Sequence, residues 1–156
     1  MPKIVLETWI NAKREIVFDL SRSVDLHLIS TQKTNEKAIA GKTSGLMVLN
    51  DTITWRAKHL GIYQNLTTKI TAFEKQFHFT DEMVKGAFKG FKHEHYFEDV
   101  NEGTLMKDIF DYQSPCGIFG YFADSIFLKK YMTYFLMERN KVIKQCAESE
   151  KWRDIL

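Results

Sequence analysis

Three predicted β-strands follow one another in residues 77–112, which read FHFTDEMVKGAFKGFKHEHYFEDVNEGTLMKDIFDY. The predicted strands cover residues 77–84, 88–98 and 104–112, and glycine-containing turns separate them. Short connections between consecutive strands are typical of an antiparallel meander. This stretch therefore predicts an antiparallel sheet.

The same pattern of strands and turns extends towards the N-terminus. Further strands are predicted at 46–49, 52–60 and 62–74, and an Asn-Asp turn follows the first of them. Residues 31–44 are polar and rich in Lys and Thr, which predicts a loop, or a loop with a weak edge strand. On the C-terminal side Pro115 ends the sheet, because proline cannot donate a hydrogen bond to a neighbouring strand.

The first thirty residues predict one strand and two short helices. Residues 3–10 alternate between apolar and mixed faces, as a half-buried strand does. Helical spacing of apolar residues predicts a helix at about 12–21, capped by Asn11. A second helix at about 24–31 is expected to begin after Ser23.

A long helix is predicted from about residue 119 to residue 148. Its first half is apolar nearly all round and carries many aromatic rings, among them Phe119, Phe122, Phe127 and Tyr131. Packing across a curved sheet, with some rings facing a cavity, explains these rings; a dimer contact is the alternative. The order of elements predicts an α+β fold in which a curved antiparallel sheet wraps around the long helix. A pocket is expected between the sheet and the helix.

Length and composition limit the number of domains and the classes of binding partner. The 156 residues suit a single domain spanning residues 1–156, with no repeat or linker. A net charge of +2 is too balanced for an electrostatic grip on nucleic acid, and no apolar run has the ~18 residues of a membrane span. Cys116 and Cys146 form no disulfide framework and no signal peptide is evident, so a cytoplasmic protein is expected.

Several segments of the chain resemble the SRPBCC superfamily, which includes START-type lipid-binding domains, pollen-allergen-like proteins and polyketide cyclase/dehydrase-like proteins. The matching segments cover nearly the whole chain: residues 18–27 (FDLSRSVDLH), 54–59 (TWRAKH), 81–88 (DEMVKGAF), 91–97 (FKHEHYF), 103–108 (GTLMKD) and 114–120 (SPCGIFG), leading to Arg139-Asn140. They resemble most closely the uncharacterised bacterial cyclase/dehydrase-like branch. The resemblance implies the helix-grip fold and a pocket for a hydrophobic ligand, but no single reaction.

Ionisable side chains share strand faces with aromatic residues. Alternation places His93 and His95 on one face between two phenylalanines, and it carries Asp108 inward with the rings of the next strand. A carboxylate that faces inward needs a hydrogen-bond partner, and histidines are the obvious partners for Asp81 and Asp108. Four interpretations stay open: a structural network or hydrated face, the polar lining of a ligand pocket, an acid–base pair, or a metal site.

No metal and no cofactor are expected. His93 and His95 are only two ligands on one strand, whereas a usual zinc site needs a third and a fourth. The candidate carboxylates lie on other strands, at distances that the sequence does not give. In the long helix, Glu138 or Arg139 is expected to reach the pocket rim or a salt bridge.

The leading hypothesis is binding of a small hydrophobic or aromatic ligand between the sheet and the long helix. The alternatives are a cyclase- or dehydratase-type enzyme that uses a His/Asp pair on a polyketide-like carbonyl compound, and a protein-interaction module, with a homodimer possible. The predicted pocket residues are Trp55, His59, Phe79, Asp81, Met83, His93, His95, Asp108, Phe110, Tyr112, Phe127 and Tyr131.

Overall fold

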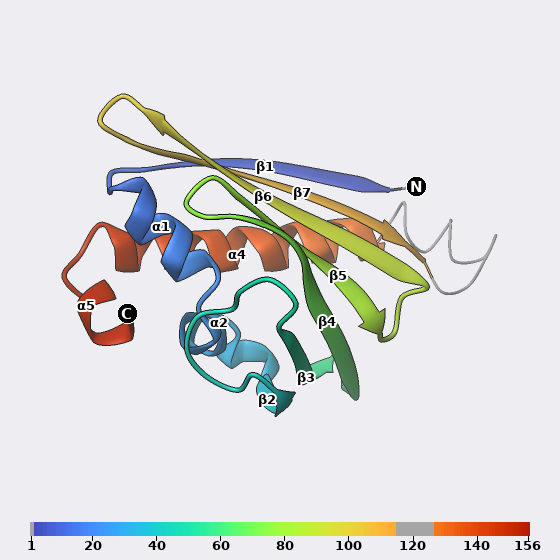
Figure 1. The fold of residues 1–156 in the computed structure, drawn as a ribbon. Coiled ribbons are helices and arrows are strands. Elements are labelled where there is room, and N and C mark those ends of the chain that lie inside the picture. The colour runs from blue at the N-terminus through green and yellow to red at the C-terminus, as the bar shows by residue number, and fades with distance from the viewer. Residues whose placement is uncertain (1, 115–126) are drawn as a thin grey trace.

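The computed structural model describes residues 2–114 and 127–156, in which seven antiparallel strands form one sheet (Figure 1). The strand order in the sheet is β1-β7-β6-β5-β4-β3-β2. Apart from the pair β1 and β7, strands that are adjacent in the sheet are therefore also consecutive along the chain. The strands are β1 (Lys3–Ile10), β2 (Lys37–Gly41), β3 (Thr52–His59), β4 (Ile62–Glu74), β5 (His78–Lys85), β6 (Gly90–Val100) and β7 (Gly103–Gln113). This order confirms the predicted antiparallel meander.

Helices cover one face of this sheet. They are α1 (Arg14–Ser21), α2 (Val24–Ser30) and α4 (Lys129–Ala147); the short α5 (Trp152–Ile155) contacts α1, and a 3₁₀ turn spans Gln32–Thr34. Helix α4 runs along the strands, and α1 and α2 lie beside it at one end (Figure 1). The predicted α+β helix-grip architecture is thereby confirmed. None of the helices within the described residues is long and apolar enough to cross a membrane.

The alternation predicted for β6 and β7 is present in the structure. His93, His95 and Phe97 are buried on β6, the residues between them are half-buried, and Lys92 and Glu98 on either side are exposed. The two strands pair without a register shift along their whole length, so the buried faces of β6 and β7 coincide. Lys92 and Glu98 stay in water because burying their charges would cost far more than burying neutral imidazoles.

An aromatic cluster fills the end of the sheet near α1. Phe18 of α1 is fully buried and makes edge-to-face contacts with Phe73, Phe79 and Phe97, at ring-centroid distances of 5.5, 5.8 and 5.3 Å. Aromatic pairs in this geometry stabilise a core beyond the area that they bury. The cluster therefore joins α1 to three strands of the sheet.

Two local predictions are wrong. Residues 46–49 form no strand: Leu46 makes one isolated bridge to Ser23, and the amide of Met47 donates to the carbonyl of Arg22. Residues 46 and 47 thus bond to Arg22 and Ser23, the linker between α1 and α2, and not to a neighbouring strand. Asn11 does not cap α1, because the helix begins at Arg14 and its N-cap position is occupied by Lys13, two residues later.

Other local predictions are confirmed. Ser23 caps α2, where its hydroxyl accepts a hydrogen bond from the amide of Leu26. The weak edge strand in the polar segment is β2. Of the helix predicted at about 119–148, Lys129–Ala147 is present as α4; its residues 119–126, with Cys116 and Pro115 before them, lie outside the described residues, so its first part stays a prediction.

Candidate functional site

A cavity of about 330 Å³ lies between the concave face of the sheet and α4. Its walls come mostly from strands β3 to β7 and from α4, with α2 at one end, and apolar surface dominates them. Eight of the predicted pocket residues line it: Trp55, His59, Phe79, Asp81, His93, His95, Phe110 and Tyr131. Whether these residues contact a ligand stays a prediction.

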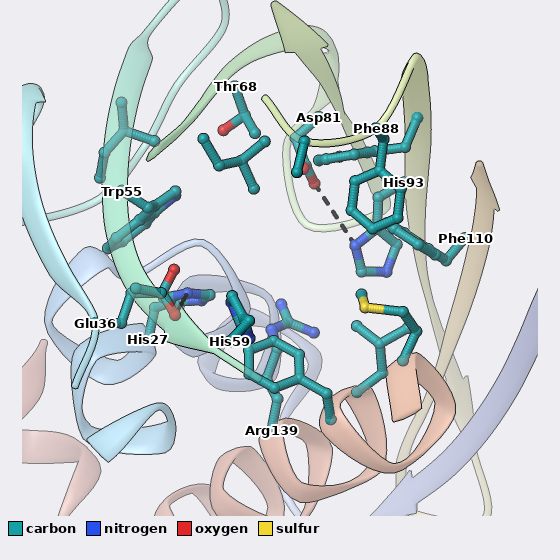
Figure 2. A pocket seen from close by; sticks show the side chains of 18 of the residues that line it. His27, Glu36, Trp55, His59, Thr68, Asp81, Phe88, His93, Phe110 and Arg139 are labelled. Atoms are coloured by element: carbon teal, nitrogen blue, oxygen red, sulfur yellow. Dashed lines mark ion pairs between the residues drawn. The ribbon is translucent and has the colours of Figure 1, made fainter. Parts of the chain in front are cut away.

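Two aspartates and two histidines form a polar wall at one side of the cavity, in which Asp81 is half-buried and the other three residues are buried. Asp81 lies on β5 directly opposite His93 on β6, and His95 lies directly opposite Asp108 on β7. His95 Nε2 is 3.0 Å from Asp81 Oδ1, and His95 Nδ1 is 2.7 Å from Asp108 Oδ1. The His95 ring therefore bridges two carboxylates. Figure 2 shows Asp81 and His93 side by side at this wall.

Helix α4 supplies the support behind this wall. Asn140 Nδ2 donates a hydrogen bond of 2.6 Å to Asp108 Oδ2. The buried guanidinium of Arg139 lies 3.5 Å from Asp108 Oδ1 and donates to the carbonyl of Ser21. Of the two candidates in the long helix, Arg139 thus reaches the pocket, while Glu138 pairs with Lys33 at 3.1 Å.

The charges in this wall follow from burial and hydrogen bonding. Burial alone would raise the pKa of Asp108, but the two histidine rings beside it and the charge of Arg139 hold the pKa well below its usual value. Burial lowers the pKa of His95, yet its bonds to Asp108 and Asp81 outweigh this and raise the pKa overall. Burial and the neighbouring His95 lower the pKa of His93, which favours the neutral ring.

A second polar group lies on the other side of the cavity (Figure 2). The side chain of Glu36 is only 6% exposed and lies 3.3 Å from His27, whose ring packs on Trp55 at a centroid distance of 4.3 Å. His59 Nδ1 lies 2.7 Å from the hydroxyl of Tyr131. Burial alone would raise the pKa of Glu36, but the neighbouring His27 outweighs this and lowers the pKa overall, so this side keeps a carboxylate.

Glu36 and His27 were not among the predicted pocket residues. Glu36 belongs to a polar segment without periodicity, so no pattern in the sequence pointed it inward. His27 lies three residues after Val24 on α2, a spacing that would have placed it near the buried face. Only the tertiary fold brings the two side chains together beside Trp55.

Four predicted pocket residues do not line this cavity. Asp108 lies behind His93 and His95, and Tyr112 is covered by Phe88, at a centroid distance of 5.6 Å. A register shift between β4 and β5 interrupts the alternation beside Met83, which is half-buried. Phe127 is 52% exposed and stacks on Tyr131 from outside.

Apolar side chains close the space between the two polar groups. Phe88, Phe91 and Phe110 pack against one another near His93, with Phe110 at a centroid distance of 5.2 Å from the His93 ring. Leu128, Met132 and Leu136 of α4 and its preceding turn belong to the same hydrophobic cluster and also line the cavity. A molecule held here would meet hydrocarbon over most of its surface and polar groups at two places.

Comparison with known proteins identifies the fold, but no family and no activity. No family model and no curated protein sequence matches the chain. Among solved structures, protein TTHA0849 of Thermus thermophilus superposes with a TM-score of 0.75 at 16% identity, over 92% of this chain and 95% of that one. Protein CV1439 of Chromobacterium violaceum gives 0.71 at 9% identity, over 96% and 99% of the two chains.

A plant protein with the same fold gives a comparable superposition. The major latex-like protein 151 of Panax ginseng has a TM-score of 0.69 at 15% identity, over 95% of this chain and 98% of that one. Identities this low establish a common fold, not a common activity. The helix-grip, pollen-allergen-like architecture is therefore shown, and the resemblance to the bacterial cyclase/dehydrase branch is not.

Proposed function

We propose that this protein binds a small, largely apolar or aromatic molecule in the cavity between the sheet and α4. The observation that carries the proposal is a cavity of about 330 Å³ with mainly apolar walls and a few buried polar groups. Ligand sites in proteins usually combine these two features, because apolar area supplies affinity and a few polar groups orient the ligand. The resemblance of the chain to the SRPBCC superfamily, which includes START-type lipid-binding domains, supports the same role.

Two buried polar groups determine how such a ligand would lie. One end would face Asp81, His93 and His95, and the other would face Glu36, His59 and Tyr131. A carbonyl or hydroxyl group suits either end, since histidine and tyrosine both donate and accept hydrogen bonds. The ligand class is therefore an apolar or aromatic body with one or two oxygen-bearing groups.

Trp55 offers a direct readout of binding, because it lines the cavity and is buried. Titration with the fluorescent apolar probe N-phenylnaphthylamine should give one-to-one binding with energy transfer from tryptophan. The variant Ala57→Phe, which puts a ring into the cavity from a buried position on β3, should abolish it. Ala40→Phe on the exposed edge strand β2 is the matched control and should bind normally.

Native mass spectrometry of freshly purified protein tests the same proposal without a probe. A co-purified apolar adduct that is present in the wild type and absent in Ala57→Phe supports it. Absence of probe binding by the folded wild type, or equal binding by Ala57→Phe, would contradict it.

A cyclase- or dehydratase-type enzyme is the second candidate. The observation that favours it is that the Asp81–His95 contact of 3.0 Å borders the cavity instead of lying sealed in the core. A carboxylate–imidazole pair in this position could move a proton on a carbonyl compound held by the aromatic walls. A linear β-triketone is a suitable substrate to test.

Binding and turnover can be separated by one variant. Asp81→Asn keeps the shape of the wall and removes the carboxylate, so it should stop cyclisation of the triketone while the apolar probe still binds. If wild type and Asp81→Asn turn the triketone over equally, or neither does, the enzyme hypothesis fails and the binding proposal stands by itself.

A further inference from the structure

Three donor atoms from two neighbouring strands converge at the polar wall of the cavity. They belong to Asp81 on β5 and to His93 and His95 on β6, and all lie within 4.8 Å of one another. His95 Nε2 is 3.0 Å and His93 Nδ1 is 3.9 Å from the same oxygen, Asp81 Oδ1. Separations of about 3–4 Å are those expected between ligands that each lie about 2 Å from one metal ion.

We propose that Asp81, His93 and His95 bind one divalent first-row transition metal ion, such as Zn²⁺ or Fe²⁺, at the wall of the cavity. Two imidazoles and one carboxylate are the ligand set of catalytic zinc sites and of non-haem iron sites, which keep positions open for water or substrate. All three side chains line the cavity, so the remaining coordination positions would face it.

Asp108 lies where a supporting carboxylate is expected. The other ring nitrogens both lie near Asp108 Oδ1: His95 Nδ1 at 2.7 Å in a hydrogen bond, and His93 Nε2 at 3.3 Å without hydrogen-bond alignment. Metal-binding histidines usually donate their second N–H to a carboxylate, which fixes the tautomer and leaves the other nitrogen free for the metal. Asp108 is itself held by a 2.6 Å hydrogen bond from Asn140.

A purely hydrogen-bonded network explains this arrangement less completely. His93 Nε2 is buried but not aligned for a hydrogen bond, although buried polar atoms in proteins are nearly always bonded. Without a metal, one proton lies in the hydrogen bond between His95 Nε2 and Asp81 Oδ1. In the metal complex, the ion would replace that proton, which is released, and would also bind His93 Nδ1.

The metal site was not expected from the sequence, because only two ligands share a strand. Pairing of β5 with β6 brings Asp81 opposite His93 and supplies the third ligand. The inference does not depend on the proposed binding of an apolar ligand. Either can fail without the other, since metal binding can be measured in the absence of any organic molecule.

The direct test is nitrogen-15 NMR of the histidine rings in the wild-type protein, purified without a tag and treated with a chelator. Addition of one equivalent of Zn²⁺ should shift His93 Nδ1 and His95 Nε2 as metal-bound nitrogens. Their partner nitrogens should remain protonated, and the half-buried His78 should keep its spectrum. Binding that appears only at other histidines, or no binding of one equivalent, would overturn the proposal.

Variants give an independent readout by Co²⁺ absorption, in which bound Co²⁺ shows visible ligand-field bands. Wild type and the control His78→Ala should form a one-to-one Co²⁺ complex, and His93→Ala and Asp81→Asn should lose it. Circular dichroism checks that each variant is folded. Equal Co²⁺ binding by wild type and a folded Asp81→Asn would contradict the assignment.

Elemental analysis of protein purified anaerobically identifies the native ion. Binding of N-phenylnaphthylamine in the presence of chelator tests the apolar-ligand proposal separately from the metal site.

Discussion

Asp108 is the residue on which the buried polar contacts of β6, β7 and α4 converge. One of its oxygens lies 2.7 Å from His95 Nδ1, and the other accepts a 2.6 Å hydrogen bond from Asn140. Its carboxylate also lies 3.5 Å from the buried guanidinium of Arg139. Removal of one partner from such a cluster leaves the remaining charges buried and unpaired.

Asp108→Asn should therefore lower the free energy of unfolding by about 3–5 kcal/mol, because Arg139 would lose its buried counter-charge. Urea denaturation at neutral pH measures this loss. Asp99→Asn is the control: Asp99 is 66% exposed in its ion pair with Arg14, and breaking a surface pair costs about 0–1 kcal/mol. Equal losses in the two variants would show that Asp108 is not the centre of the buried cluster.

Gly41 is a second residue whose identity is dictated by its surroundings. Its φ angle is +74°, and a Cβ atom there would lie 2.2 Å from the carbonyl oxygen of Thr52. Both the backbone conformation and the space require glycine at this position.

Gly41→Ala should destabilise the protein by about 1–3 kcal/mol, since the backbone of β2 or β3 would have to move. Thermal unfolding followed by circular dichroism measures the change. Gly90→Ala is the matched control, because a Cβ at Gly90 meets nothing within 4 Å; it should change stability by less than about 0.5 kcal/mol. An equally stable Gly41→Ala would mean that the edge strand rearranges without cost.

Helix α4 is the element that closes the cavity and supports its polar wall. Its inner side carries the buried residues Leu136, Arg139, Asn140 and Ile143, whereas Tyr134 and Met137 on the other side are exposed. The spacing of three and four residues along the inner side is that of one helix face. The same helix thus lines the apolar cavity and holds Asp108 through Asn140.

Ile143→Ala should cost about 2–5 kcal/mol of stability, because Ile143 is fully buried and the substitution leaves a void in the core. Met137→Ala, at a position that is 54% exposed on the same helix, should change the stability by less than about 0.5 kcal/mol. Chemical denaturation of the two variants in parallel gives the comparison. A large loss in Met137→Ala would indicate that this exposed side packs against a partner, as in the homodimer that the sequence left possible.

The assembled sheet and helix α4 form the cavity in which we propose that a ligand binds. A ligand that binds only the folded protein stabilises it by mass action, by about 2.7 kcal/mol when its free concentration is 100 times its dissociation constant. For a chain of this size, 1 kcal/mol corresponds to a shift of about 2–4 °C in melting temperature.

Saturation with N-phenylnaphthylamine should therefore raise the melting temperature by about 5–10 °C in the wild type. Ala57→Phe should show no shift, because its ring occupies the space that the probe needs. Differential scanning calorimetry with and without the probe measures both. A shift of the same size in Ala57→Phe would mean that the probe binds elsewhere on the surface.

Local patterns in the sequence were enough to predict the architecture and much of the inward-facing side of the sheet. Strand alternation is local, so the buried faces of β6 and β7, with His93, His95 and Asp108 on them, followed from charge and ring placement alone. The cap of α2 at Ser23 is local as well. Where a local rule was insufficient, as for residues 46–49, a distant segment supplied the hydrogen bonds.

Which side chains meet depends instead on the assembled molecule. Pairing of β5 with β6 brings Asp81 within 3.0 Å of His95, and packing of α4 brings Asn140 to Asp108 and Tyr131 to His59. Burial of Glu36 beside His27 likewise joins a polar loop to α2. These distances depend on strand register and helix packing across the whole chain, and no local pattern encodes them, because burial is a property of the assembled core.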